Sequence, residues 1–313
     1  MRKESYIINT DPPAPWYSLI FLVLIFIAGL FIGQFCGLLI SYFITDLRID
    51  ELASLVSPPM TSEKQLPLLV IQGLGTMGGF IAGGMIYLSL VEKFPTKRLF
   101  TIKNLGPYTI LIAIVLVISF MFVNTYFIEW NANMDFPDFL GKFESWAREK
   151  EEELRRVTEF LTVFESHWEF LLGFIVIAIL PAVGEELIFR GIIQNKLHIY
   201  FKNIHLAIWI SAILFSGFHV QFYGFVPRLL LGGLFGYIYY WSRNLWYPII
   251  GHFINNGFTL IMIYLYQIDK TKINIEQEDA YPTTVILVFA MITTYMLISF
   301  RRKVIQRPKE DYG

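Results

Sequence analysis

Long apolar stretches recur along this sequence of 313 residues, and each is about as long as a lipid bilayer is thick. A helix needs about 20 mostly apolar residues to cross roughly 30 Å of hydrocarbon. Because lipid offers the backbone no hydrogen-bond partners, such stretches are expected to be helices rather than loops. The sequence therefore predicts an all-α, polytopic membrane protein with about eight transmembrane helices. We place them at 17–44, 67–91, 106–128, 168–194, 204–223, 225–242, 245–266 and 282–300.

Composition supports a bilayer environment and excludes some classes of partner. Hydrophobic residues make up 55% of the chain and charged residues 16%, whereas soluble domains carry about 25% charged residues. The net charge of −1 argues against nucleic acid as a partner, since that role needs a basic surface. Cys36 is the only cysteine, which excludes an internal disulfide and a CxxC metal site. Membrane lipid is the expected surrounding partner.

The distribution of lysine and arginine predicts how the chain is oriented in the membrane. Basic residues mark the cytoplasmic connections of membrane proteins, and an even number of helices puts both ends on one side. We therefore expect a cytoplasmic segment 1–16, a single transmembrane domain 17–300 and a basic cytoplasmic tail 301–313, in the cell membrane of a bacterium. The basic residues on that side are Arg2, Lys3, Lys93, Lys97, Arg98, Lys103, Lys196, Lys202, Arg243, Arg301, Arg302, Lys303, Arg307 and Lys309.

One long connection, residues 129–167, has helical periodicity of its own. Phe143, Trp146, Leu154, Val157 and Leu161 recur mostly at spacings of three and four, around a strongly charged centre. This pattern predicts an amphipathic helix. Such a helix can lie on the membrane surface or pack as a solvated helix on the bundle, and the sequence leaves both open.

Small residues at four-residue spacing indicate faces where helices approach closely. We expect most of these faces to pack within the chain, with a dimer interface as the alternative. The glycines concerned are Gly29, Gly33 and Gly37; Gly75, Gly79 and Gly83; and Gly232 and Gly236.

Three charged residues stand inside the run 179–191 of the fourth apolar stretch, where an ionised side chain costs about 2.5–3.5 kcal/mol or more. Glu186 and Arg190 are four residues apart, so they share a helix face and can pair. Glu185 points about 100° away from Glu186 on a helix. The pair is predicted to be structural, and Glu185 is the carboxylate left to do chemistry.

Candidate partners for Glu185 lie on later helices. They are His219 near the end of one apolar stretch, and His252 and Asn256, which share a face of another at i, i+4. Glu185 could take a proton from water and return it to a leaving amine, while His219 orients that water. His252 and Asn256 could donate hydrogen bonds to an oxyanion. No cofactor is needed for this chemistry, but Glu185, His219 and His252 are also a ligand set suited to zinc, which is the alternative.

These residues carry a resemblance to a known family. The sequence resembles the CPBP group of intramembrane proteases, the CAAX-protease and bacteriocin-processing family, whose hallmarks are EExxxR, FxxxH and HxxxN in that order. They stand here as Glu185–Arg190, Phe215–His219 and His252–Asn256. The resemblance covers about 170–260, within a motif core that we place at 168–266.

The resemblance implies an endopeptidase that works inside the membrane on membrane-associated or lipidated proteins and peptides. In relatives, the first glutamate and first histidine are viewed as activating water, and the second histidine and the asparagine as an oxyanion hole. Glu185, His219, His252 and Asn256 match these roles. Two other classes stay open: a non-proteolytic scaffold or bacteriocin-immunity protein, and a proton-coupled transporter, since buried acids and histidines also form proton relays.

Overall fold

The computed structural model describes residues 16–45, 51, 55, 60–100, 105–273 and 280–306, and this part of the chain consists of helices and connections without strands. Residues 1–15 of the predicted N-terminal segment and residues 307–313 of the predicted tail lie outside the described residues. All eight predicted apolar stretches fall on helices, so the prediction of an all-α membrane protein is confirmed.

Six helices among the described residues are long and apolar enough to cross a membrane. They are α1 (Leu19–Ile44), the continuous helix Ser62–Val91, α5 (Pro107–Ala132), the continuous helix His167–Phe201, α12 (Trp246–Gln267) and α13 (Thr283–Ile305). The other two predicted spans are α10 (Ile204–Phe218) and α11 (Phe225–Ser242). At about 1.5 Å per residue, the 15 residues of α10 are too short for the full hydrocarbon thickness.

The predicted boundary of the fifth span at residue 223 is wrong, and a local backbone change explains why. Helix α10 ends at Phe218, and Val220 has a φ of 54°, which no right-handed helix contains. A 3-10 turn, η10 (Phe222–Gly224), then leads into α11. His219 therefore lies just past the helix end, on a connection.

The two longest continuous helices alternate between α-helical and π-helical segments. Turns with i→i+5 bonds are uncommon and often occur near functional sites. The first contains η2 (Ser62–Lys64), α3 (Gln65–Thr76), η3 (Met77–Ala82), α4 (Gly83–Ile86) and η4 (Tyr87–Val91); the second contains α7 (His167–Gly173), η8 (Phe174–Ile179), α8 (Leu180–Glu186), η9 (Leu187–Gln194) and α9 (Asn195–Phe201). Of these, η3, η4, η8 and η9 are π-helical.

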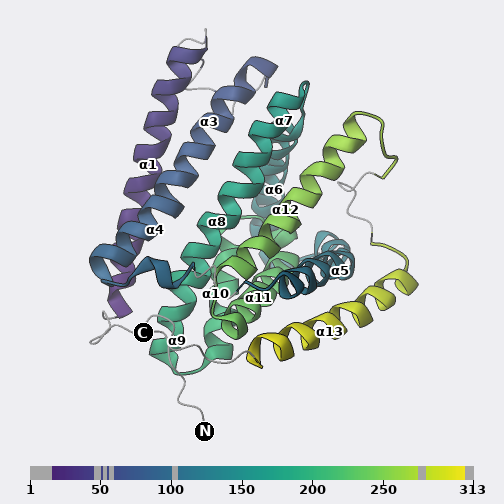
Figure 1. Ribbon diagram of the computed structural model, residues 1–313. Coiled ribbons are helices and arrows are strands. Elements are labelled where there is room, and N and C mark those ends of the chain that lie inside the picture. Colours follow the sequence, from purple (N-terminus) through teal and green to yellow (C-terminus); the bar gives the residue numbers. More distant parts are fainter. Residues whose placement is uncertain are drawn as a thin grey trace.

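Helix α1 lies directly against α3 and η3, and glycines make the close approach possible (Figure 1). A Cβ atom on Gly33 would overlap the carbonyl oxygen of Leu74, and one on Gly29 would overlap that of Gly78. These glycine faces therefore pack within the chain, as predicted, although the contribution of Gly78 was not foreseen.

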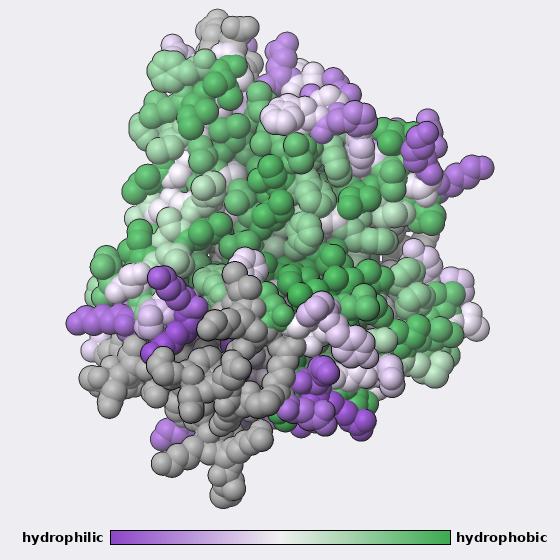
Figure 2. Space-filling view, in the orientation of Figure 1, coloured by the Kyte–Doolittle hydropathy of each residue, from purple (hydrophilic) through white to green (hydrophobic). Residues whose placement is uncertain are grey.

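The motif helices are held by two apolar clusters. One surrounds η9 and includes Leu187, Phe189 and Tyr87. The other joins α5, α11, α12 and α13 through residues such as Phe235 and Phe300. On the outer surface, Figure 2 shows hydrophobic side chains over the middle of the visible face and hydrophilic ones toward its upper and lower parts. This distribution fits a protein that spans a bilayer.

The long connection contains the predicted amphipathic helix, α6 (Gly141–Thr162), preceded by the 3-10 turn η7 (Asp138–Leu140). Val157 and Leu161 pack against Leu69 and Val176 of the bundle. The structure thus agrees with the alternative in which α6 packs on the bundle. The remaining short 3-10 turns are η1 (Trp16–Ser18) and η5 (Thr96–Arg98).

Candidate active site

The predicted pair of Glu186 and Arg190 forms within the continuous helix His167–Phe201. Arg190 Nη1 lies 2.7 Å from Glu186 Oε1, and the two side chains are 1% and 0% exposed. Arg190 Nη2 also donates to the carbonyl oxygen of Gly232 on α11 at 3.1 Å. The guanidinium carbon lies 4.6 Å from the centre of the Phe215 ring. A charge pair this deeply buried is tolerable only with such additional partners.

Glu186 also contacts the second histidine of the motifs. Its Oε1 atom accepts a hydrogen bond from His252 Nδ1 at 2.8 Å. His252 is 3% exposed. Its ring stacks on the Phe235 ring, with the ring centroids 5.5 Å apart and an angle of 21° between the planes. The carboxylate that holds Arg190 therefore also fixes the orientation of His252 across two helices.

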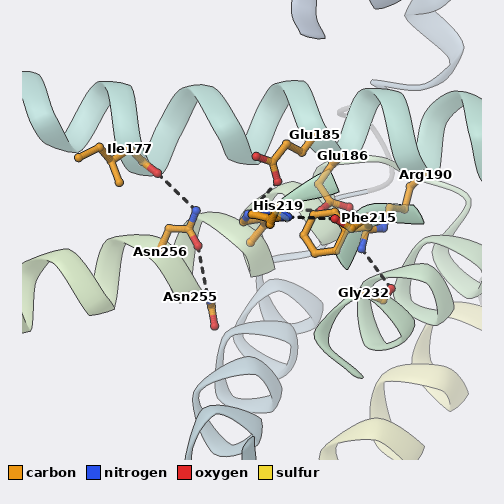
Figure 3. Close-up of polar contacts among 10 residues, drawn as sticks. Ile177, Glu185, Glu186, Arg190, Phe215, His219, Gly232, Asn255 and Asn256 are labelled. Atoms are coloured by element: carbon orange, nitrogen blue, oxygen red, sulfur yellow. Dashed lines mark hydrogen bonds and ion pairs between the residues drawn. The ribbon is translucent and has the colours of Figure 1, made fainter. Parts of the chain in front are cut away.

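The Glu185 side chain makes no hydrogen bond among the described residues. It is 13% exposed, and its Oε2 atom lies 3.8 Å from His252 Nε2. Within the described part of the chain, that buried oxygen has no hydrogen-bond partner. Figure 3 shows Glu185 and Glu186 on one helix, and the dashed line from the Glu185 carboxylate marks its contact with His252. A buried free carboxylate beside an imidazole is suited to accept a proton from a bound water.

His219 is fixed by the backbone just before it. Its Nδ1 atom lies 2.9 Å from the carbonyl oxygen of Phe215. Because a carbonyl can only accept, Nδ1 carries the proton, and the lone pair of neutral His219 is on Nε2. The Phe215 ring contacts both imidazoles, with centroid distances of 5.2 Å to His219 and 6.0 Å to His252. Phe215 therefore packs against both histidines.

Asn256 has a different set of contacts from the other predicted site residues. Its Nδ2 atom donates to the carbonyl oxygen of Ile177 at 3.3 Å, and its Oδ1 atom accepts from Asn255 Nδ2 at 3.1 Å (Figure 3). Pro181 has no N–H group, so it cannot give Ile177 the usual i→i−4 bond. The asparagine amide thus bonds to a carbonyl that lacks its usual i→i−4 donor, and among the described residues its second N–H hydrogen has no acceptor.

The structure brings Glu185, Glu186, Arg190 and His252 into one contact network. His219 adjoins this network through Phe215, and no hydrogen bond or ion pair links it to Glu185 among the described residues. Asn256 lies on the same helix as His252 but bonds to η8. Sequence reasoning missed the bond between Glu186 and His252, because the motif spacing gave Glu186 a partner on its own helix. It also missed the aromatic packing of Phe215 and Phe235. The FxxxH motif includes Phe215, but none of the three motifs includes Phe235.

The side chains of the alternative zinc site are not gathered around one point in the described structure. Among the residues that the structure describes, no three His, Cys, Asp or Glu side chains stand close enough together to hold a metal ion. This applies to Glu185, His219 and His252, whose gathering would need a change in side-chain positions.

Comparisons with known proteins point to one enzyme family. Residues 167–258 match a family model described as "Type II CAAX prenyl endopeptidase Rce1-like". Over 213 residues the chain is 25% identical to the Bacillus subtilis (strain 168) protein called "Putative membrane peptidase YdiL". This match covers 68% of this chain and 79% of that protein.

A shorter match links the chain to "Uncharacterized protein YpbD" of Bacillus subtilis (strain 168). The identity is 29% over 84 residues, which is 26% of this chain and 40% of that protein. The match thus spans less than half the length of this relative. No solved structure matches the chain significantly.

Proposed function

The chain belongs to the CPBP family of intramembrane proteases, and from this premise we propose that it hydrolyses peptide bonds of membrane-associated or lipidated proteins and peptides. The proposed active residues are Glu185, His219, His252 and Asn256. One observation carries the proposal most directly: Glu185 has a buried carboxylate oxygen without a hydrogen-bond partner, 3.8 Å from the Nε2 atom of His252.

Water activation is the proposed role of Glu185 and His219. Glu185 takes a proton from a water molecule as its oxygen attacks the carbonyl carbon of the substrate. His219, protonated on Nδ1, accepts a hydrogen bond from that water through Nε2 and so orients it. When the C–N bond breaks, Glu185 returns the proton to the leaving nitrogen. The products are a carboxylic acid and an amine, and Glu185 is again ionised.

Oxyanion stabilisation is the proposed role of His252 and Asn256. His252 Nδ1 already donates to Glu186, so a donor on Nε2 requires the imidazolium form, with its charge between Glu185 and Glu186. That positive group would stabilise the oxyanion of the tetrahedral intermediate. The free N–H hydrogen of Asn256 is the second proposed donor. Arg190 and Glu186 support this arrangement by holding His252 in place.

We propose that this chemistry needs no metal, with zinc as the alternative. The residue placement supports the metal-free form, because the candidate ligands are not gathered into a cation site among the described residues. Activity of the purified protein is therefore expected to be unchanged by a strong zinc chelator. Loss of activity that added Zn²⁺ restores would contradict this part of the proposal.

Cleavage by purified protein in lipid vesicles tests the function. A library of membrane-anchored and prenylated peptides would be incubated with the wild type, Glu185→Gln and His219→Ala. We expect the Glu185→Gln rate to fall by about 10²–10⁴ and the His219→Ala rate by a similar factor, since each removes a group that acts on the water proton.

The matched control is His205→Ala, which removes a histidine from the exposed start of α10, where it contacts Tyr237. This variant is expected to keep wild-type activity. Retention of cleavage in Glu185→Gln would contradict the proposed mechanism. Absence of cleavage by the wild type, together with an in vivo function that both variants retain, would favour the scaffold alternative.

A further inference from the structure

A large cavity adjoins the proposed active site. Its volume is about 1270 Å³, above the few hundred to about 1,000 Å³ of pockets for small molecules. It lies between α5, α6, η10, α11 and α12, with the start of α13 nearby. A space of this size fits a peptide segment of several residues better than a single small ligand. We call it the α6 chamber.

The wall of the α6 chamber is formed by neighbours of the proposed catalytic residues. Gln221, which lines it, follows His219 by two residues, and Asn255, which also lines it, donates to Asn256. Glu185, His219 and His252 themselves are not part of its lining. The part of a substrate held in the chamber would therefore lie beside the active site without contacting Glu185, His219 or His252.

Arg228 is the residue of this wall that stands out by charge. Its Nη2 atom donates to Gln221 Oε1 at 2.6 Å, and its Nη1 atom donates to the Gln221 carbonyl oxygen at 3.4 Å. Both partners are neutral. Within the described residues Arg228 forms no ion pair, but the charge of Glu151 acts on it from a distance, and Gln221 Nε2 donates to Glu151 at 3.1 Å. The positive charge is also within electrostatic range of Glu185 and His219.

The other arginines of the chamber are already paired. Arg148 contacts Glu144 and Asp135, and Arg155 contacts Glu152 and Glu159. The hydrogen bond from Arg148 also lowers the pKa of Glu144, so this carboxyl is charged at neutral pH. Arg228 is partly buried, and burying a charge costs free energy that a directly bonded counter-ion can offset. Its planar fork of donors matches a carboxylate.

We propose that Arg228 binds a carboxylate of the substrate and so sets which peptides the enzyme accepts. This inference rests on the proposed function. The carboxylate can come from the free C-terminus of the substrate or from an acidic side chain near the cleaved bond. In either case the α6 chamber holds the charged part of the substrate while the cleaved bond lies at Glu185.

Peptide binding to a cleavage-deficient protein tests the proposal separately from catalysis. Full-length Glu185→Gln protein in detergent would be titrated with a fluorescent peptide whose cleavage by the wild type has been established. Four peptides are compared: free acid or C-terminal amide, each with a glutamate or a glutamine near the cleaved bond. The variants are Arg228→Gln and Arg228→Lys in the same background.

We expect Arg228→Gln to weaken binding of the carboxylate-bearing peptide about 10- to 100-fold, which is the value of a charge-assisted hydrogen bond. The ratio of the affinity for that peptide to the affinity for its neutral form should fall to near one. Arg228→Lys should restore part of it. Loss of preference for the free acid identifies a C-terminal carboxylate, and loss of preference for the glutamate identifies a side chain.

The matched control is Arg156→Gln, an exposed arginine of α6 that does not line the chamber, and it should bind as the parent protein does. Thermal melting of each variant confirms folding. The proposal is overturned if folded Arg228→Gln keeps the parent preference, or if the parent shows no preference for any carboxylate. Failure of Glu185→Gln to lower cleavage would overturn the proposed function instead, and the binding result would still stand.

Discussion

At the scale of single residues, one oxygen atom organises the site. Glu186 Oε1 accepts from Arg190 Nη1 at 2.7 Å and from His252 Nδ1 at 2.8 Å. The first bond keeps a buried guanidinium paired, and the second keeps the imidazole in one orientation. Glu186 thus has a role in stability and a role in positioning, and the two can be separated by mutation.

The combination of Glu186→Gln with Arg190→Met separates these roles. Glu186→Gln alone leaves Arg190 buried without a counter-ion and is expected to cost about 3–5 kcal/mol. Adding Arg190→Met removes that unpaired charge and should recover much of the stability. Activity should stay low in the double variant, because His252 still lacks its anionic partner. Unfolding free energies and cleavage rates of both singles and the double are the measurements.

Recovery of activity along with stability would show that Glu186 does not position His252. Arg190→Met alone is the remaining corner of the cycle, and it should be less stable than the double variant because Glu186 then keeps only His252 as a partner in the core.

Residue spacing was enough to predict the pair on one helix but not the contacts between helices. Glu186 and Arg190 are four residues apart, so helix geometry alone brings them together. The bond from His252 to Glu186 depends on the rotation and depth of α12 relative to the helix His167–Phe201, which no spacing within one helix determines. For the same reason the separate attachment of Asn256 to Ile177 could not be foreseen. The catalytic roles of Glu185, His219, His252 and Asn256 stay predictions.

At the scale of elements, the contact between α1 and the helix Ser62–Val91 depends on backbone approaching backbone. Gly29 and Gly33 face the carbonyl groups of Gly78 and Leu74 so closely that no Cβ atom fits. Close contact of this kind replaces the hydrophobic driving force, which is missing between helices inside lipid.

Gly33→Ala is expected to destabilise the protein by about 1–3 kcal/mol, because the added methyl group forces the two backbones apart. The control is Gly141→Ala at the start of α6, where no atom lies within 4 Å of the position that a Cβ would take. The control should be neutral or slightly stabilising, since alanine favours a helix more than glycine does. Thermal unfolding in a fixed detergent compares them, and equal melting temperatures would contradict the packing role.

The apolar stretches predicted the helices well because their length is a direct consequence of bilayer thickness. The end of α10 was missed because residues 219–223 have no proline or charged residue to interrupt the apolar run. The π-helical turns η8 and η9 were also not predicted, since the pattern of apolar residues does not distinguish i→i+4 from i→i+5 bonding.

At the scale of the whole molecule, the positions of α1 and α13 indicate how the chain is oriented in the membrane. The start of α1 and the end of α13 lie toward the same end of the bundle (Figure 1). Arg301 lies over the Trp241 ring and Lys303 over the Tyr108 ring at that end. Helix α6, with its charged face, packs near the other ends of α3 and α12. Together with the positive-inside rule, this arrangement supports the prediction that both termini are cytoplasmic.

Cysteine labelling in intact bacterial cells tests this topology. Cys36 is the only natural cysteine, so Cys36→Ser gives a background without thiols. In that background Arg156→Cys on α6 should react with a membrane-impermeant maleimide, whereas Arg302→Cys at the end of α13 should react only after the cells are lysed. The reverse pattern would show that the orientation is wrong.

Pro181 affects the depth at which two helices of the site meet. These are the helix His167–Phe201, which carries Glu185, and α12, which carries His252. The missing N–H of Pro181 leaves the Ile177 oxygen for the Asn256 amide, which lies one turn beyond His252 on α12. If α12 slid along its neighbour by one turn, about 5.4 Å, the Ile177 oxygen would lose the Asn256 donor. Pro181, four residues before Glu185, thereby favours the position of α12 in which His252 Nε2 lies 3.8 Å from the Glu185 carboxylate.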